Sequence, residues 1–148
     1  MSLSVEQLTQ PLKIAKRIQE TADSVSLALE IPSTQKSNFN YQAGQFVTLF
    51  MDINGEQINR SYSLCTSPLT DQEFKITIKK VQGGKGSTFL CDKVKEGDTL
   101  RVTKPAGHFF KPSMMPTQYF LFAAGSGITP IYSILKTVLT ADEDNLIS

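Results

Sequence analysis

Short runs in which apolar and polar residues alternate, separated by turn residues, most constrain how this chain of 148 residues can fold. Val25 to Ile31 is the clearest run, because its apolar residues recur at every second position. Successive side chains of a β-strand point to opposite faces, so each run predicts a strand with one buried face. Asn54-Gly55 joins two of the runs and is typical of a tight hairpin. We expect six strands, at residues 12–18, 25–31, 44–51, 57–65, 74–81 and 99–103.

One short helix is predicted between the last two of these strands. Ser87 and Thr88 are residue types that favour the start of a helix, and Gly97 follows its expected end. Residues 1–10 are expected to form a poorly ordered lead-in, and residues 33–42 a polar loop. Short strands joined by turns, with one small helix, predict an all-β antiparallel six-stranded barrel of the Greek-key type.

The pattern changes towards the end of the chain. Residues 119–124 are continuously apolar, which is typical of a parallel strand buried on both faces. A helix should follow, with Thr129 as its cap and Pro130 at its first position, and Leu146-Ile147 should open a second strand. This pattern predicts the first strand–helix unit of an α/β nucleotide-binding domain. The expected domains are therefore 1–112, the barrel, and 113–148, a linker and the start of the second domain.

Composition and charge argue against several classes of function. The formal net charge is +1, with 15 basic and 14 acidic residues spread along the chain, which disfavours nucleic-acid binding. Cys65 and Cys91 form no paired motif and His108 is the one histidine, so we expect no metal site in this chain. We find no signal peptide and no apolar run long enough to span a membrane. A cytoplasmic protein without membrane contact is the expectation.

Arg60 to Ser63 is the first stretch whose side chains suit a cofactor. In a strand, Arg60 and Tyr62 share one face, and Ser61 and Ser63 share the other. A guanidinium can clamp phosphate, and a flat ring beside it can stack on a heterocycle. The same spacing also occurs in exposed edge strands, so this stretch alone does not decide the function.

Two glycine-rich stretches offer further contacts to a nucleotide. Residues 83–88 form a turn that opens a helix, whose free N–H groups favour a phosphate, and Lys79, Lys80 and Lys85 lie nearby in sequence. Glycines in residues 124–130 allow the backbone to approach a flat ring closely. Each stretch has a simpler alternative, because the first is typical of a flexible hairpin loop and the second lacks a glycine of the Rossmann fingerprint. The three stretches in this order are more specific than any one of them.

Together these stretches resemble the ferredoxin–NADP reductase superfamily. The resemblance implies an N-terminal six-stranded barrel that binds FAD and a C-terminal α/β domain that binds NAD(P)H. Within the superfamily the chain is most similar to bacterial oxygenase reductases such as the phenylacetyl-CoA epoxidase reductase, which also carry a [2Fe–2S] ferredoxin domain. The matching stretches are Arg60-Ser61-Tyr62-Ser63, Lys79-Lys80-Val81, Gly83 to Thr88, Pro105 to Phe109 and Ala123 to Pro130.

The resemblance implies roles for individual residues around the flavin. Tyr62 would stack on the isoalloxazine ring, Ser63 would lie beside its reactive N5 edge, and Arg60 would bind the pyrophosphate. The turn around Ser87 would close over the phosphates, and Thr129 would line the nicotinamide pocket. Ser63 and Thr129 are thus the implied catalytic residues. The implied cofactor-binding residues are Arg60, Ser61, Tyr62, Ser63, Lys79, Val81, Gly86, Ser87, Thr88, Gly125, Gly127 and Thr129.

The implied reaction is hydride transfer from NAD(P)H to FAD, followed by single-electron transfer to an iron–sulfur or oxygenase partner. FAD is preferred over FMN on the resemblance. Since the chain stops early in the second domain, we expect little NAD(P)H turnover from these residues, and any [2Fe–2S] cluster would lie in a further domain. Two alternatives stay open, a flavin-binding module without turnover and a flavin-free barrel that binds a protein or ligand.

Overall fold

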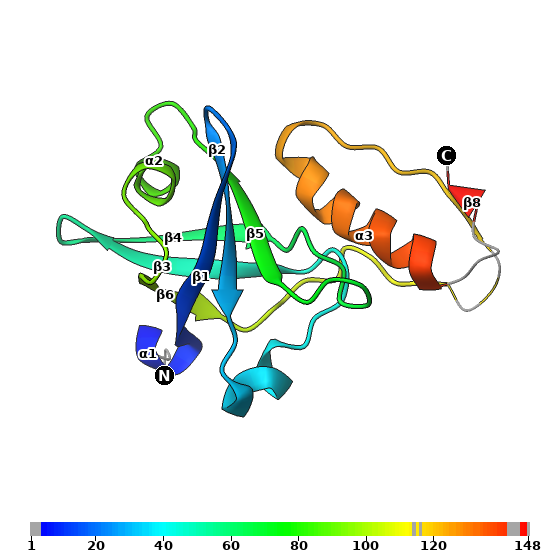
Figure 1. Ribbon diagram of the computed structural model, residues 1–148, viewed down its shortest axis with the longest axis horizontal. Helices are drawn as coiled ribbons and strands as arrows, with labels where there is room; N and C mark the ends of the chain where they lie inside the picture. The colour runs from blue at the N-terminus through cyan, green and yellow to red at the C-terminus, as the bar shows by residue number, and fades with distance from the viewer. Residues whose placement is uncertain (1–3, 114, 116, 142–145, 148) are drawn as a thin grey trace.

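The computed structural model describes residues 4–113, 115, 117–141 and 146–147. Six strands form one antiparallel sheet in the spatial order β4-β3-β6-β1-β2-β5 (Figure 1). Every strand predicted for the barrel is present and overlaps its predicted range. The strands are β1 Thr9–Thr21, β2 Ser24–Glu30, β3 Phe46–Ile53, β4 Glu56–Ser63, β5 Phe74–Lys79 and β6 Thr99–Thr103.

The sheet curls until its two edge strands, β4 and β5, approach each other. Just beyond the end of β4, Cys65 N donates to Lys75 O at 3.0 Å, and Leu64 forms a bridge with Ile76. Strands β2 and β3 follow each other in the chain but are not neighbours in the sheet, and the same holds for β5 and β6. These crossing connections are the Greek-key arrangement, so the predicted antiparallel barrel is confirmed.

The hairpin between β3 and β4 sets the register of the strand that carries Arg60. Asn54 and Gly55 both have positive φ, +56° and +80°, as a type I′ turn requires. The pairing places Arg60 opposite Leu49 and Tyr62 opposite Val47. Leu49 and Val47 are fully buried, so Arg60 and Tyr62 lie on the face of β4 that continues from the core.

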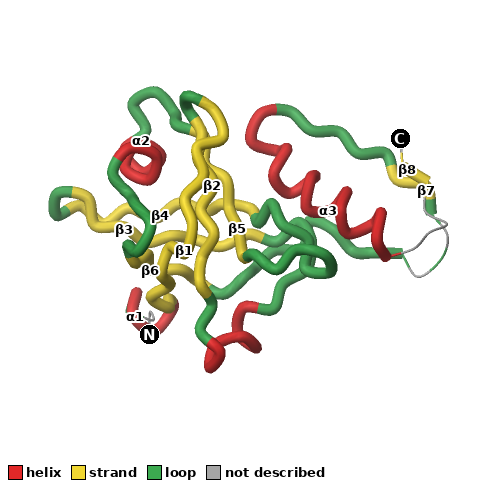
Figure 2. The backbone as a smooth tube through the Cα atoms, viewed as in Figure 1, coloured by secondary structure: helices red, strands yellow, loops and turns green. Residues whose placement is uncertain are grey.

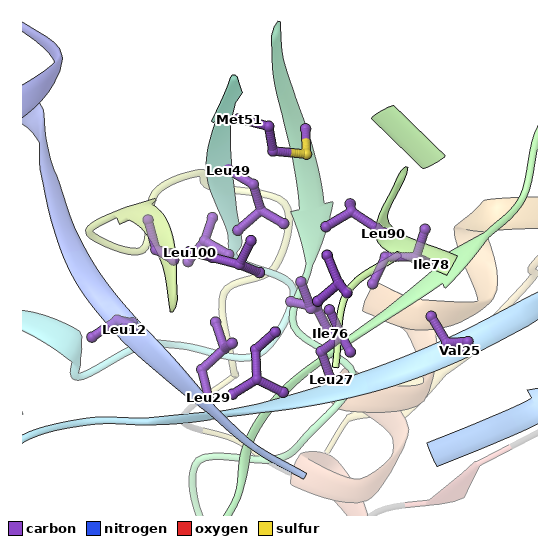
Figure 3. Close-up of a cluster of buried hydrophobic side chains, with 14 of the residues drawn as sticks. Leu12, Val25, Leu27, Leu29, Leu49, Met51, Ile76, Ile78, Leu90 and Leu100 are labelled. Atoms are coloured by element: carbon purple, nitrogen blue, oxygen red, sulfur yellow. The ribbon is translucent and has the colours of Figure 1, made fainter. Parts of the chain in front are cut away.

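The core fills the barrel with aliphatic side chains from the strands, and helix α2 (Lys85–Asp92) closes over it. Figure 3 shows side chains from β1, β2, β3, β5, β6 and α2 pointing towards one another. Leu90 of α2 is fully buried among them. Truncating a side chain of this kind to alanine typically lowers the free energy of unfolding by about 2–5 kcal/mol. The core therefore holds in place the strands and the helix that carry the surface stretches. The labelled side chains are Leu12, Val25, Leu27, Leu29, Leu49, Met51, Ile76, Ile78, Leu90 and Leu100.

Three local predictions in the barrel are wrong. Helix α1 (Val5–Leu8), capped by Ser4, occupies part of the expected lead-in, and β1 begins directly after it. The 3-10 helix η1 (Ser33–Phe39) occupies the expected loop, and its last residue, Phe39, is buried in the core. Helix α2 begins at Lys85 after Gly84, without a side-chain cap, so the predicted caps Ser87 and Thr88 lie inside the helix.

The second unit is only partly as predicted. Strand β7 (Gln118–Tyr119) pairs in parallel with β8 (Leu146–Ile147), which confirms the parallel pairing. The predicted strand over 119–124 is wrong beyond Tyr119, since Phe120 and Phe122 are unpaired and exposed. The 3-10 helix η2 (Gly125–Gly127) leads into helix α3 (Ile128–Ala141). Helix α3 starts before the predicted cap, Thr129, so that prediction is also wrong.

Helix α3 lies beside the barrel on the side of β5 (Figure 2). Ile131, Ile134, Leu135, Val138 and Leu139 repeat at helical spacing in the sequence, but the face that they form is only partly the contact face. Ile134 and Val138 are buried, but Leu139 is 57% exposed, and Ser133 and Thr137 are buried instead. The face is rotated towards the polar loop that follows β4, because that loop offers hydrogen-bond partners to both hydroxyls.

Candidate functional site

A cleft of about 750 Å³ lies between the barrel and the segment that opens helix α3. Its lining comes mainly from three stretches far apart in the sequence, namely the end of β4, residues 77–87 from β5 into α2, and the residues around η2, and Ser24 of β2 also lines it. Small-molecule sites commonly occupy roughly 300–1,000 Å³. The cleft is therefore large enough for an extended ligand, and it is the candidate functional site.

Strand β4 brings all of Arg60, Ser61, Tyr62 and Ser63 to the cleft. The Arg60 side chain is exposed, and its Nη1 donates to Asn59 O at 2.6 Å. No carboxylate among the described residues lies within ion-pair distance of this guanidinium. Most of its five N–H donors are therefore available to an anionic ligand.

Tyr62 presents a half-buried ring at the edge of the core. Burial raises the pKa of its phenol, the nearby Cys91 adds to the rise, and Arg60 opposes it, so the ring is neutral at physiological pH. On the opposite face of β4, Ser61 Oγ shares a hydrogen bond with Thr48 Oγ1 at 2.8 Å. The Ser63 hydroxyl, by contrast, bonds to none of the described residues. The ring and the Ser63 hydroxyl are thus the groups that β4 leaves available beside Arg60.

The Ser87 hydroxyl holds the turn that leads into helix α2. Its Oγ accepts from Val81 N at 3.0 Å and donates to Gly84 O at 3.3 Å, and the residue is 8% exposed. Thr88 N donates to Gly84 O at 3.0 Å as the first bond of the helix. The N–H groups of the three preceding residues have no partner within the helix. An anion would therefore meet free N–H groups and the positive end of the helix dipole here.

Two glycines keep a cradle open between this turn and β4. A Cβ atom on Gly84 would lie 2.7 Å from Ser87 Oγ. A Cβ atom on Gly86 would lie 3.2 Å from Arg60 Cγ and 3.3 Å from Met51 Cε. These separations are shorter than the ~3.5–4.0 Å optimum for carbon contacts. A larger residue at position 86 would fill the space between the start of α2 and Arg60, and one at position 84 would displace the Ser87 hydroxyl.

The lysines near the turn all form ion pairs. The pairs are Lys79 with Asp23, Lys80 with Asp92 and Lys85 with Glu56. Lys79 and Lys80 line the cleft and Lys85 does not. Their carboxylate partners offset part of their charge, so among the described residues Arg60 is the cation of the cleft lining without such a partner.

The opposite wall of the cleft is the segment around η2. Gly125, Ser126, Ile128 and Thr129 line it, whereas Gly127 does not. Gly125 has a φ of +56°, in the left-handed region that favours glycine. Thr129 Oγ1 donates to Ser126 O at 3.1 Å, which tightens the turn at the start of α3. This wall therefore combines small residues, Gly125 and Ser126, with the side chains of Ile128 and Thr129.

All the predicted cofactor-binding residues except Thr88 and Gly127 line the one cleft. Sequence reasoning missed Ser24 and Thr77. Gly84, Ser126 and Ile128 lie within the predicted stretches, but neither they nor Lys80 received an individual role. Thr77 had a signal in the sequence, because it stands two residues before Lys79 on the same strand and so shares its face. Ser24 had none, since it reaches the cleft by pairing with Lys79 across β2 and β5.

The described part of the chain gives little support for a metal site, a reactive thiol or a membrane-spanning helix. No group of three or more His, Cys, Asp or Glu residues there could hold a metal ion. Cys65 and Cys91 are free and buried, and burial raises the pKa of both thiols, so neither is a ready thiolate. No helix among the described residues has both the length and the apolar character needed to span a bilayer.

The groups in the cleft suit a ligand that carries both phosphate and a flat ring. The unpaired guanidinium and the helix N-terminus can bind phosphate, and the Tyr62 ring can stack on a heterocycle. The glycine cradle leaves room for the phosphates between them. The donor set therefore fits a flavin dinucleotide.

Comparison with known proteins gives the same cofactor class. The model of the oxidoreductase FAD-binding domain family matches residues 11–110. The chain is 44% identical over 131 residues to the ferredoxin reductase component of 3-ketosteroid-9-alpha-monooxygenase from Rhodococcus rhodochrous, covering 87% of this chain and 37% of that protein. It is 34% identical over 136 residues to one component of the 1,2-phenylacetyl-CoA epoxidase from Escherichia coli K12, covering 90% of this chain and 38% of that protein.

A solved structure is similar as well. Ferredoxin NADP+ reductase from Neisseria gonorrhoeae, with bound FAD and NADP, superposes with a TM-score of 0.72 at 25% identity, covering 87% of this chain and 51% of that one. The chain spans little more than a third of the two curated relatives. The family match nevertheless extends from the third residue of β1 to the segment after β6. The chain therefore belongs to the oxidoreductase FAD-binding domain family, within the ferredoxin–NADP reductase superfamily.

Proposed function

We propose that this chain is the flavin-binding part of an NAD(P)H-dependent oxidoreductase that passes electrons to an iron–sulfur partner of an oxygenase. The observation that carries the proposal is the cleft in which the unpaired Arg60, the Tyr62 ring and the N-terminus of α2 face one ligand-sized space. Two relatives named as reductase or epoxidase components support the oxygenase context. In this proposal residues 1–112 bind FAD, and residues 113–148 begin the NAD(P)-binding domain.

The proposed residue roles follow from the groups that each residue leaves available. Arg60 and the free N–H groups at the start of α2 would hold the pyrophosphate, with the glycine cradle giving it room. The Tyr62 ring would cover the flavin ring, and Ser63 would supply a hydroxyl donor beside it. Because its hydroxyl is engaged in the turn, Ser87 would act through its backbone N–H.

The remaining cleft residues would shape the rest of the site. Lys79 and Val81 lie where the adenosine or ribityl part would pass, and Gly125 and Thr129 would line the approach of the nicotinamide. Thr88 and Gly127 do not line the cleft, so neither is given a role. When bound, the flavin supplies hydride acceptance from NAD(P)H and release of electrons one at a time. The protein supplies stacking, charge neutralisation and exclusion of water.

A second candidate function is a flavin-binding module without NAD(P)H turnover. The observation that favours it is that the groups suited to a phosphate and to a flat ring all lie on β4 and at the start of α2. Both functions require the same flavin cleft. We also infer a cytoplasmic location, on the basis of the two free cysteines and of relatives that are reductase components.

The test of the proposal is flavin binding by the chain and by its Arg60→Ala variant. Loss of a charge-assisted contact to the pyrophosphate should weaken FAD binding by about 1–3 kcal/mol, or roughly 5- to 150-fold in Kd. Binding is measured by titration of absorbance or of flavin fluorescence. Arg101→Ala is the matched control, because Arg101 is an exposed arginine of the barrel, paired with Glu6, that does not line the cleft.

The outcomes separate the alternatives. FAD retained through desalting, with binding weakened by Arg60→Ala and unchanged by Arg101→Ala, would support the proposed cleft. Equal binding by both variants would show that the pyrophosphate does not lie at Arg60. A folded chain that binds no FAD at high protein concentration would favour the flavin-free barrel. Chromatography of acid-released flavin distinguishes FAD from FMN.

A further inference from the structure

A cluster of buried polar side chains joins helix α3 to the loop that follows β4. Ser133 Oγ donates to Thr66 O at 2.6 Å, and Ser67 Oγ and Thr137 Oγ1 share a hydrogen bond at 2.8 Å. Lys136 Nζ and the Asp71 carboxylate form an ion pair at the rim. The junction cluster consists of Thr66, Ser67, Asp71, Ser133, Lys136 and Thr137.

The hydroxyl groups of this cluster are almost completely withdrawn from water. Ser67 and Ser133 are 0% exposed, Thr66 is 1% and Thr137 is 6%. Burying a hydroxyl costs free energy unless it is hydrogen-bonded. Among the described residues no buried side-chain nitrogen or oxygen lacks a partner. The cluster is therefore a fully satisfied polar network in a place where apolar packing is the common solution.

The apolar part of the same contact is small. Its fully buried members are Ala43, Ile134 and Val138, with partly buried side chains around them. Apolar burial is non-directional, so a small apolar patch by itself specifies the rotation of a helix only weakly. Hydrogen bonds weaken steeply with distance and angle. The polar contacts are thus the directional part of the interface between α3 and the barrel.

The cluster joins the two segments that lead to the walls of the flavin cleft. Ser67 is four residues after Ser63, and the chain between them is held by bonds from Leu64 N to Gln45 O and from Cys65 N to Lys75 O. On the other side, α3 begins directly after η2, whose residues line the opposite wall. A rotation of α3 would therefore move one wall relative to the other.

We propose that Ser67, Ser133 and Thr137 are positioning residues that hold the η2 turn at a fixed place across the cleft from the end of β4. The position of α3 against the barrel follows from these contacts alone. Its effect on the access of nicotinamide rests on the proposed function. None of the three side chains lines the cleft. They act through α3, which carries the Gly125–Thr129 wall.

Substitutions at Thr137 test the proposal because they separate its hydroxyl from its bulk. Thr137→Val keeps the size and removes the hydroxyl, and Thr137→Ser restores the hydroxyl. Thr140→Val is the matched control: Thr140 Oγ1 donates to Lys136 O at 2.9 Å just as Thr137 Oγ1 donates to Ser133 O at 2.9 Å, but Thr140 is exposed. All three substitutions lie on one helix, so helix propensity is comparable.

The readout is the distance between nitroxide labels on α3 and on the barrel, measured by double electron–electron resonance in the full chain. Labels are attached through Leu139→Cys and Gln57→Cys, both at exposed positions, while the native cysteines are buried. We expect one narrow distance distribution for the parent chain, Thr137→Ser and Thr140→Val. Thr137→Val should give a displaced and broader distribution.

Several results would overturn the proposal. A parent-like distribution for Thr137→Val, or equal disturbance by Thr140→Val, would show that the hydroxyl does not position α3. If Thr137→Val fails to fold, Ser67→Ala removes the same hydrogen bond from the barrel side and must give the displaced distribution. FAD binding by the parent chain is measured separately. If Thr137→Val displaces α3 but the parent chain binds no FAD, the positioning role is supported and the proposed function is contradicted.

Discussion

Side chains in the cleft differ in how many of their hydrogen-bonding groups already have a partner within the protein. The Arg60 guanidinium bonds to one backbone carbonyl and has no carboxylate partner among the described residues. The Ser87 hydroxyl both donates and accepts within its own turn. Two side chains that suggest phosphate binding on residue type alone therefore have different roles. Arg60 is available to a ligand, and Ser87 maintains the turn.

Ser87→Ala should destabilise the chain even without flavin. The substitution leaves Val81 N–H without its acceptor and Gly84 O without its donor at a buried site, which should cost about 1–2 kcal/mol of unfolding free energy. Chemical denaturation of the flavin-free chain measures this change. Thr88→Ala is the control, because its hydroxyl bonds to no other described residue. Equal stability of Ser87→Ala and the parent chain would contradict the role in the turn.

At the scale of elements, helix α3 is held to the barrel by a polar face. The helix buries Ser133 and Thr137 alongside Ile134 and Val138. Its outer residues Ile128, Tyr132 and Leu139 are exposed. The ion pair between Lys136 and Asp71 adds an electrostatic contribution to the contact between α3 and the barrel.

This pair should make the docking of α3 sensitive to acid. Partial burial raises the pKa of Asp71, but hydrogen bonds from Lys136 and from Ser67 N–H outweigh it, so the pKa lies below its ordinary 3.8. A carboxyl whose folded pKa is lowered contributes stability above its unfolded pKa. That contribution is lost as pH falls through the folded value.

Asp71→Asn should therefore lower the unfolding temperature at neutral pH, and the difference from the parent chain should close as pH falls below about 4. Thermal unfolding of both chains across this range measures the effect. Lys136→Met removes the same pair from the other side and should give the same convergence. Curves that stay parallel down to acid pH would show that the pair does not stabilise the fold.

The whole molecule consists of a well-filled barrel and a second unit with a small core. The barrel core draws on all six strands and α2, whereas only three fully buried apolar residues among those described form the core at α3. Large apolar side chains are exposed on the second unit, among them Phe120 at 61% and Phe122 at 84%. Contiguous exposed apolar surface promotes association.

Phe122→Ser should reduce self-association of the chain without destabilising it. An exposed ring contributes little to the folded state, so the unfolding temperature should stay within experimental error, while light scattering at high protein concentration should fall. Dynamic light scattering and thermal unfolding measure the two effects. A marked fall in unfolding temperature would show that the ring packs against the chain in solution.

The sequence by itself determined those features that depend on neighbours in the chain. Alternation predicted every strand of the barrel, because burial of one face requires a two-residue period. Asn54-Gly55 predicted the hairpin, because both residues tolerate positive φ. The motif at Arg60 to Ser63 and the glycines before α3 each allowed a nucleotide site, and their order in the chain together with the resemblance to a known superfamily made that prediction specific.

Only the tertiary structure decided features that depend on partners distant in sequence. The start of α2 at Lys85 follows from a turn that Ser87 closes onto Val81, and the place of Ser24 in the cleft follows from cross-strand register. The apolar run after Tyr119 was predicted as a strand, but a strand requires a partner, and pairing with β8 extends over two residues. Hydrogen bonds between distant segments are not encoded in local periodicity, so these features became visible only in the folded chain.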